Sequence, residues 1–204
     1  MMERDSSDFG REAMKYRKSS ETEVEVFLRL NGSAEISIHS GYGMFDHMLK
    51  LLAFWAGFDL ELDCKGDLDV DAHHSMEDCG LVLGSAFREA LGDRRGIIRA
   101  ASASVPMDEA MTSVSLDLSG RSFLVWRNDE LLPPVIAGEE KDVWREFYKA
   151  FTAEGRFNLH ISFLYGKNGH HLLESVAKGC GMALREAIVL EGHAVKSTKG
   201  SFDL

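Results

Sequence analysis

The stretch HHSMEDCGLVLGSAFREAL (residues 73–91) decides the fold, because the chain contains it twice. HHLLESVAKGCGMALREAI (residues 170–188) repeats it 97 positions later, with the HHxxE motif and the later REA in one register. In the first copy the apolar residues recur at helical spacing and Gly92 ends the run, which predicts a helix that opens at HHxxE. Such a repeat indicates that the chain consists of two similar halves.

The repeat extends upstream of both predicted helices. FDHMLKLLAFWAGFDLEL (residues 45–62) aligns with WREFYKAFTAEGRFNLHI (residues 144–161) at an offset of 99. Each of these segments predicts a helix followed by a strand, with a glycine between them. The alignment places His47 opposite Glu146.

A third pair of segments begins each half. ETEVEVFLRLNG (residues 21–32) aligns with EAMTSVSLDLSG (residues 109–120) at an offset of 88, and Glu21 falls opposite Glu109. Alternating apolar residues predict a strand in both. We therefore predict an α+β fold of two half-domains. Each is a largely antiparallel sheet with helices on one face, and the two helical layers pack together.

The predicted organisation has four parts. Residues 1–20 are polar and predict a mobile N-terminal arm. Residues 21–95 form the first half-domain, and residues 96–108, punctuated by glycine and proline, form the junction. Residues 109–204 form the second half-domain and end in a candidate phosphate-binding tail.

Charge and cysteine content exclude several classes of partner. The 33 acidic and 23 basic residues give a net charge of −10, which disfavours binding to nucleic acid and to anionic membranes. The three cysteines show no Cys-x-x-Cys spacing, so neither a disulfide framework nor a thiolate zinc site is expected. No apolar stretch is long enough to span a bilayer or to target the chain. We expect a cytoplasmic globular protein.

The duplicated motif predicts a two-metal site. On a helix His73 and His74 each share a face with Glu77, whereas adjacent histidines point roughly 100° apart. The two histidines should therefore serve different ions. A single His-His at a helix start is more often a solvated polar patch, but two equivalent copies supply two sets of four ligands. Imidazole and carboxylate donors suit manganese, iron or zinc. The candidate ligands are His47, His73, His74, Glu77, Glu146, His170, His171 and Glu174.

Other residues have a functional and a structural interpretation. Glu21 begins a strand and could carry a proton, or could be an exposed edge glutamate. His160 alternates with apolar neighbours and predicts a half-buried strand histidine. Small or apolar residues that we expect in the core are Met48, Phe54, Trp55, Cys79 and Cys180.

Basic residues near three glycines suggest phosphate binding. Arg99 follows a glycine-bounded turn, Arg121 follows Ser119-Gly120, and Ser197 and Lys199 lie in STKG near the C-terminus. Guanidinium forks with a Ser/Lys loop suit a phosphate monoester, provided that these residues converge in space.

Several motifs in order resemble the imidazoleglycerol-phosphate dehydratase family of L-histidine biosynthesis. They are FDHML, GDLDVDAHHSMED, PMDEA, DLSGR, NLH, GKNGHHLLESVAKG, ALREA and STKG, between about Arg17 and Gly200. The resemblance implies dehydration of D-erythro-imidazole glycerol phosphate to imidazole acetol phosphate, with two Mn²⁺ ions that hold the imidazole ring as imidazolate. It also implies trimers that assemble into a 24-subunit shell, with each active site built across subunit boundaries.

The resemblance also assigns roles to individual residues. It implies seven of the candidate metal ligands, all except Glu146. It implies a phosphate site made of Arg99, Arg121, Ser197 and Lys199. Glu21 and Lys178 would contact the substrate, and the catalytic carboxylates would be Glu21, Glu77 and Glu174, with Glu21 accepting the carbon proton.

The chain departs from the family pattern at three positions. Leu51 and Trp55 replace a glutamine and a histidine that usually contact the substrate, and Glu146 replaces a usual histidine ligand. Two alternatives follow. One is a divergent di-metal enzyme acting on another phosphorylated small molecule, and the other is a non-catalytic metal-binding shell protein.

Overall fold

The computed structural model describes residues 10–198, and within them the two halves contain the same elements in the same order. The first half comprises β1 (Glu12–Lys18), β2 (Thr22–Arg29), β3 (Ile36–His39), α1 (Gly43–Ala56), β4 (Asp59–Gly66) and α2 (His73–Leu91). The second comprises β5 (Ala100–Met107), β6 (Ala110–Asp117), β7 (Phe123–Arg127), α3 (Lys141–Gly155), β10 (Asn158–Tyr165) and α4 (Gly169–Ala187). Between β7 and α3 the second half adds the short elements η2 (Asp129–Leu131), β8 (Val135–Ile136) and β9 (Glu139–Glu140).

The two four-stranded sheets have matching topology. Their strand orders are β1-β2-β4-β3 and β5-β6-β10-β7. Neighbouring strands are antiparallel except for β3 with β4 and β7 with β10, which are parallel and connected through α1 and α3. The registers also correspond, since Leu28 pairs with Leu60 and its counterpart Leu116 pairs with Leu159. The predicted duplicated α+β fold is confirmed.

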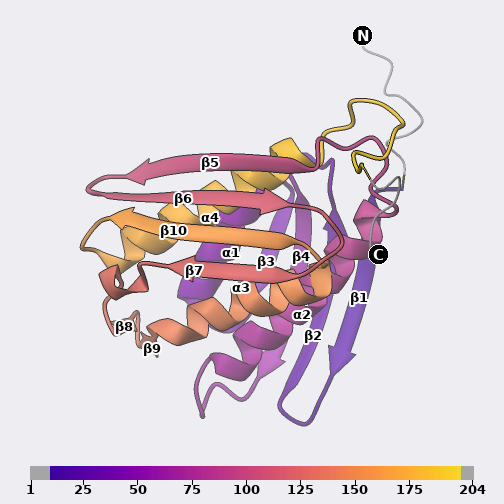
Figure 1. The fold of residues 1–204 in the computed structure, drawn as a ribbon. Coiled ribbons are helices and arrows are strands. Elements are labelled where there is room, and N and C mark those ends of the chain that lie inside the picture. The colour runs from indigo at the N-terminus through magenta and orange to yellow at the C-terminus, as the bar shows by residue number, and fades with distance from the viewer. Residues whose placement is uncertain (1–9, 199–204) are drawn as a thin grey trace.

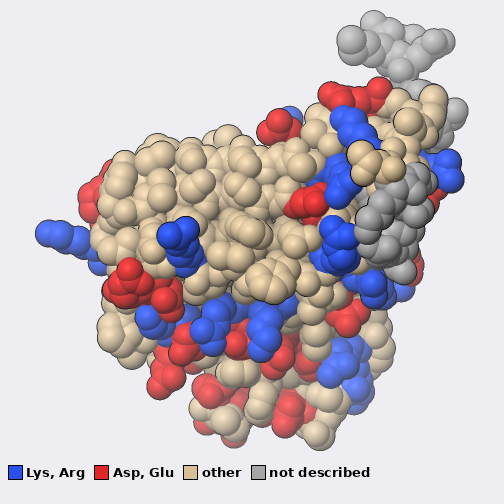
Figure 2. Space-filling model, viewed as in Figure 1, with Lys and Arg blue, Asp and Glu red and all other residues tan. Residues whose placement is uncertain are grey.

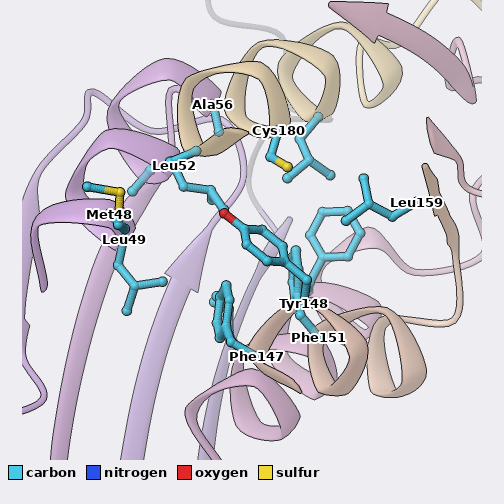
Figure 3. Close-up of a cluster of buried hydrophobic side chains, with 14 of the residues drawn as sticks. Met48, Leu49, Leu52, Ala56, Phe147, Tyr148, Phe151, Leu159 and Cys180 are labelled. Atoms are coloured by element: carbon cyan, nitrogen blue, oxygen red, sulfur yellow. The ribbon is translucent and has the colours of Figure 1, made fainter. Parts of the chain in front are cut away.

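The helices form the interior of the molecule. α1 packs against α4 and α2 against α3, with one sheet outside each helical layer (Figure 1). Apolar side chains from α1, α3 and α4 meet between the layers (Figure 3). Each such side chain contributes about 1.5–3 kcal/mol when it is fully buried. The buried set includes Met48, Leu49, Leu52, Phe147, Tyr148, Phe151 and Cys180.

Glycines let the helix pairs approach closely. A β-carbon on Gly84 of α2 would lie 2.6 Å from the Phe151 carbonyl oxygen of α3. A β-carbon on Gly181 of α4 would lie 2.5 Å from the Leu52 carbonyl oxygen of α1. In the repeat Gly84 aligns with Gly181, and Phe151 aligns with Leu52, so the two helix pairs cross in the same way.

The arm and the junction contain unpredicted strands. β1 pairs with β2 along its length, so the predicted mobile arm is wrong over residues 12–18, while residues 1–9 lie outside the described part. Only Ala13 of β1 is buried, so the strand shows no apolar alternation. β5 occupies most of the predicted junction.

The core predictions were partly wrong. Met48, Cys79 and Cys180 are buried as predicted. Phe54 and Trp55 are 59% and 37% exposed, although the backbone of α1 at Leu52 lies against Gly181 of α4. His160 is on a strand as predicted but is exposed. No helix within residues 10–198 is long and apolar enough to cross a membrane.

Candidate metal centre

Both HHxxE motifs lie in the first turn of a helix, where polar side chains fix the backbone. The Asp71 carboxylate accepts a 2.8 Å hydrogen bond from the His73 backbone N–H. The Asn168 side chain accepts a 2.9 Å bond from that of His170. These acceptors satisfy N–H groups that have no partner within the helix.

Adjacent histidine rings diverge in both copies. The ring planes of His73 and His74 are 69° apart, and those of His170 and His171 are 89° apart. The two rings of each pair also have different partners, because the first contacts the glutamate one turn along its own helix and the second contacts a carboxylate outside that helix.

One set of predicted ligands lies close together in space. His47 of α1 meets His170 and Glu174 of α4, and we call these three residues the α1–α4 half-site. Glu174 Oε1 lies 2.9 Å from His47 Nε2 and 3.0 Å from His170 Nε2. The three candidate ligand atoms all lie within 4.8 Å of one another. Two imidazoles and one carboxylate fit Mn²⁺, Fe²⁺ or Zn²⁺.

The second oxygen of Glu174 is held by a lysine. Lys178 Nζ lies 2.8 Å from Glu174 Oε2, so the carboxylate divides its oxygens between this ammonium and the histidines. Burial raises the pKa of Glu174, but the hydrogen bonds from Lys178, His47 and His170 outweigh it and lower the pKa to about 2. Glu174 is therefore ionised at neutral pH, as a metal ligand must be.

The equivalent set in the other helix pair is less tightly gathered. We call His73, Glu77 and Glu146 the α2–α3 half-site. His73 Nε2 lies 3.6 Å from Glu77 Oε2. Glu146 instead pairs with Lys149 Nζ at 2.6 Å and with the Arg145 guanidinium at 3.4 Å. Within residues 10–198, only the α1–α4 half-site brings three such ligand atoms within 4.8 Å of each other.

The second histidine of each motif is oriented by carboxylates. His74 Nδ1 lies 3.0 Å from Asp67 Oδ2 and 3.9 Å from Glu21 Oε2. His171 Nδ1 lies 2.7 Å from Glu109 Oε2. These contacts raise the pKa of both histidines, the Asp67 and Glu109 hydrogen bonds being the main causes.

Carboxylates bonded to Nδ1 leave Nε2 of each ring to bind a metal, the usual arrangement around histidine ligands. We did not predict the roles of Asp67 and Glu109. The sequence did indicate a role for Glu109, because the repeat aligns it with Glu21.

The predicted phosphate-binding residues lie at the end of the second sheet opposite to His170 and His171. Arg99 forks onto Asp117, with Nε 2.7 Å from Oδ1 and an amino nitrogen 3.0 Å from Oδ2. The Arg99 guanidinium also donates to the Lys196 carbonyl, so the neighbouring Ser197 lies close to Arg99. Lys and Arg side chains cluster at this end of the molecule (Figure 2).

Arg121 belongs to the same end. The Asn158 side chain donates to the Ser119 hydroxyl at 2.8 Å and to the Arg121 carbonyl at 3.0 Å, and Asn158 pairs with Asp117 across the sheet. Lys199 lies outside the described residues.

The two groups of residues are far apart within one chain. His170 lies in the first turn of α4, whereas the Arg99 N–H bonds to the carbonyl of Ala187, the last residue of that helix. The length of α4 between these points is about 25 Å. α4 packs against β5 (Figure 1), and β5 begins at the residue after Arg99.

A pocket of about 480 Å³ adjoins the α1–α4 half-site. His170 lines it, together with Met44 of α1, Lys167, and Val135 and Ile136 of the inserted strand β8. The inserted elements therefore form one wall of the space in front of this half-site.

Comparisons with known proteins point to one family. The family model described as imidazoleglycerol-phosphate dehydratase (IGPD) matches residues 40–184. A protein of that name from Oleidesulfovibrio alaskensis is 62% identical over 92% of this chain and 95% of its own. One from Oceanobacillus iheyensis is 46% identical over 94% and 99%.

Solved structures show the same similarity. The crystal structure of IGPD from Pyrococcus furiosus matches with a TM-score of 0.78 and 33% identity, covering 92% of this chain and 99% of that one. The enzyme from Staphylococcus aureus matches with a TM-score of 0.76 and 28% identity, covering 88% and 99%.

Proposed function

Because this chain belongs to the imidazoleglycerol-phosphate dehydratase family of hydro-lyases, we propose that it acts on D-erythro-imidazole glycerol phosphate with two Mn²⁺ ions per active site. The product would be imidazole acetol phosphate. The observation that carries the proposal is the assembled trio of His47, His170 and Glu174, with an ionised carboxylate between two imidazole nitrogens. When bound, the ions would act as Lewis acids and stabilise the substrate ring as imidazolate.

Six residues in two half-sites would hold the ions. The α1–α4 half-site supplies His47, His170 and Glu174, and the α2–α3 half-site supplies His73, Glu77 and Glu146. His74 and His171 would add their Nε2 atoms, because carboxylates occupy Nδ1 in both rings. Eight ligands for two ions leave coordination positions open for the substrate.

Glu21 is the residue that we assign to the proton transfer. It lies at the β1–β2 hairpin, its side chain is about half exposed, and Oε2 lies 3.9 Å from His74 Nδ1. A carboxylate beside the candidate metal ligand His74 would lie near the side chain of a bound substrate and would accept its carbon proton. Lys178, which is bonded to Glu174, would contact the substrate from the other half-site.

The distance along α4 supports a site shared between copies. The substrate is an imidazole ring, a three-carbon chain and one phosphate, which is much shorter than the roughly 25 Å between the ends of α4. A substrate bound at the metal ligands of one copy would therefore have its phosphate held by another copy, through Arg99, Arg121, Ser197 and Lys199. This favours a homo-oligomer, and we propose trimers assembled into a 24-subunit shell.

The cytoplasm is the compartment that we propose. Cys64, Cys79 and Cys180 are free and buried, which suits a reducing environment.

One assay tests the main proposal. Purified protein is loaded with Mn²⁺ and given imidazole glycerol phosphate, and formation of the ketone is followed while bound metal is counted. Ketone formation that depends on Mn²⁺ is expected. Two bound ions without ketone would favour the divergent enzyme, in which Leu51 and Trp55 alter the substrate site. Failure to bind metal would contradict both enzyme hypotheses. Bound metal without turnover of imidazole glycerol phosphate or of any related phosphorylated compound would favour the non-catalytic shell protein.

A further inference from the structure

The two half-sites occupy equivalent places but contain different ligands. The crossings at Gly84 and Gly181 show that α3 lies on α2 as α1 lies on α4. In the alignment of the repeat, Glu146 occupies on α3 the position that His47 occupies on α1. The difference between the half-sites comes from side chains and not from the backbone.

Those two ligands have opposite kinds of partner. His47 Nε2 lies 2.9 Å from Glu174 Oε1, which belongs to a fellow ligand, so the donor atoms of this half-site lie close together. The Glu146 carboxylate is largely buried and is bonded to two cations of its own helix, Lys149 at 2.6 Å and Arg145 at 3.4 Å. A metal ion that uses Glu146 must compete with these cations for the same oxygens.

The repeat contains a built-in comparison for Lys149. Its counterpart is Lys50, which follows His47 by three residues as Lys149 follows Glu146. Both lysines lie one helical turn from the candidate ligand, but only the glutamate can form an ion pair with its lysine. Lys50 is exposed on α1. Lys149 thus restrains the candidate ligand Glu146, whereas its counterpart Lys50 leaves the candidate ligand His47 available.

We propose that the two half-sites load in a fixed order, the α1–α4 half-site first, and that Lys149 is a positioning residue that weakens binding of the second ion by holding Glu146. The inference rests on the proposed two-metal function. It also gives the half-sites different metal preferences. The α2–α3 half-site offers one imidazole and two carboxylates, an oxygen-rich set that favours Mn²⁺ over Zn²⁺ more than the other set does.

Mn²⁺ binding, not turnover, tests this order. Metal-free protein in its native assembly is titrated with Mn²⁺, and the free ion is followed by its electron paramagnetic resonance signal. We expect one tight and one weaker class of site per chain. Lys149→Ala should tighten the weaker class about two- to fivefold, because the lysine of the pair is exposed and ion pairs with an exposed partner are weak. Lys149→Arg keeps the pair and should match the unmodified protein.

Lys50→Ala is the matched control. It removes the same charge at the equivalent position beside the other half-site, and so measures the general effect of losing a nearby cation. The Lys149→Ala effect should exceed it. In a Glu146→His background, where no ion pair can form, Lys149→Ala should do no more than Lys50→Ala.

Two results separate the possible failures. If two ions bind but Lys149→Ala and Lys50→Ala change the Mn²⁺ affinity equally, Lys149 has no positioning role. The same holds if Lys149→Ala changes the affinity equally with Glu146 and with histidine at position 146. Fewer than two ions per chain under saturating Mn²⁺ would contradict the proposed two-metal site, and the inference with it.

Discussion

Glu109 Oε2 lies 2.7 Å from His171 Nδ1, although the two residues come from different elements of the second half. Glu109 lies in the β5–β6 hairpin and His171 in the first turn of α4. The hydrogen bond from His171 lowers the pKa of Glu109 to about 2. Glu21, in the β1–β2 hairpin, lies near His74 in the first half. In both repeats, then, the first hairpin places a carboxylate beside the second histidine of HHxxE.

Glu109→Gln tests whether this carboxylate prepares His171 to bind metal. The amide keeps the shape but loses the charge, so the pKa of His171 should fall and its ring should be less firmly held. We expect Mn²⁺ to bind about 10–100-fold more weakly, as for other carboxylates behind histidine ligands. Asp108→Asn is the control for the loss of a negative charge from the same hairpin, because Asp108 lies 3.8 Å from Nε2 of His171 and not beside Nδ1. Equal affinities in the two variants would show that Glu109 has no such role.

Glu21→Gln separates proton transfer from metal binding. Glutamine cannot accept the carbon proton, so turnover should fall about 10²–10⁴-fold while the bound metal and the assembly are retained. Glu23→Gln serves as the control, since Glu23 pairs with Lys18 and Tyr16 two residues along the same hairpin. Normal turnover in Glu21→Gln would move the proton-accepting role to another residue.

The sequence predicts the repeated framework well because both copies retain the same side chains at the same spacing. HHxxE and the alternation in β2 and β6 are local patterns, and their offsets predicted which residues correspond. The equivalence of Glu109 with Glu21 was visible in this way, although its contact with His171 was not, because it depends on how the hairpin meets α4.

Features that depend on packing could not be read from the pattern. β1 buries only Ala13, so backbone pairing with β2, and not an apolar face, makes it a strand. Phe54 and Trp55 have helical spacing, but spacing alone does not tell which side of α1 meets α4. In the fold a glycine at position 181 of α4 admits the backbone of α1 at Leu52, while both rings remain partly in solvent.

Asp59 should make stability depend on acid pH. Burial raises its pKa, but hydrogen bonds from the Glu35 and Ser33 N–H groups, at 3.0 and 2.7 Å, and from Arg29 lower it overall. A carboxyl whose pKa is depressed on folding stabilises the fold above its unfolded pKa of about 3.9, and this contribution is lost as the pH falls through the folded pKa.

Asp59→Asn should therefore lower the free energy of unfolding by about 1–3 kcal/mol at pH 7, with a difference that narrows below roughly pH 4. Urea denaturation at several pH values measures it. Asp63→Asn, which changes an exposed residue of the same strand, should have little effect. A constant difference across this pH range would assign the loss to packing and not to the charge of Asp59.

The separation of His170 from Arg99 along α4 predicts complementation between inactive variants. His170→Ala removes a metal ligand and Arg99→Ala a phosphate ligand, so each protein alone should be inactive. If every site combines the metal end of one copy with the phosphate end of another, random mixed assemblies contain some sites with both ends intact. About a quarter of the sites should then be active, because each end comes independently from either variant.

The control mixture combines Arg99→Ala with Arg121→Ala, which both damage the phosphate end, so that no intact phosphate end exists in any copy. It should stay inactive. The measurement is turnover after the two variants are dissociated, mixed and reassembled, with differently tagged subunits to show that mixed assemblies have formed. If the His170→Ala and Arg99→Ala mixture contained both tags in one particle and still failed to turn over substrate, each chain would have to build its site from its own residues. The roughly 25 Å along α4 would then have to be closed by a movement within the chain.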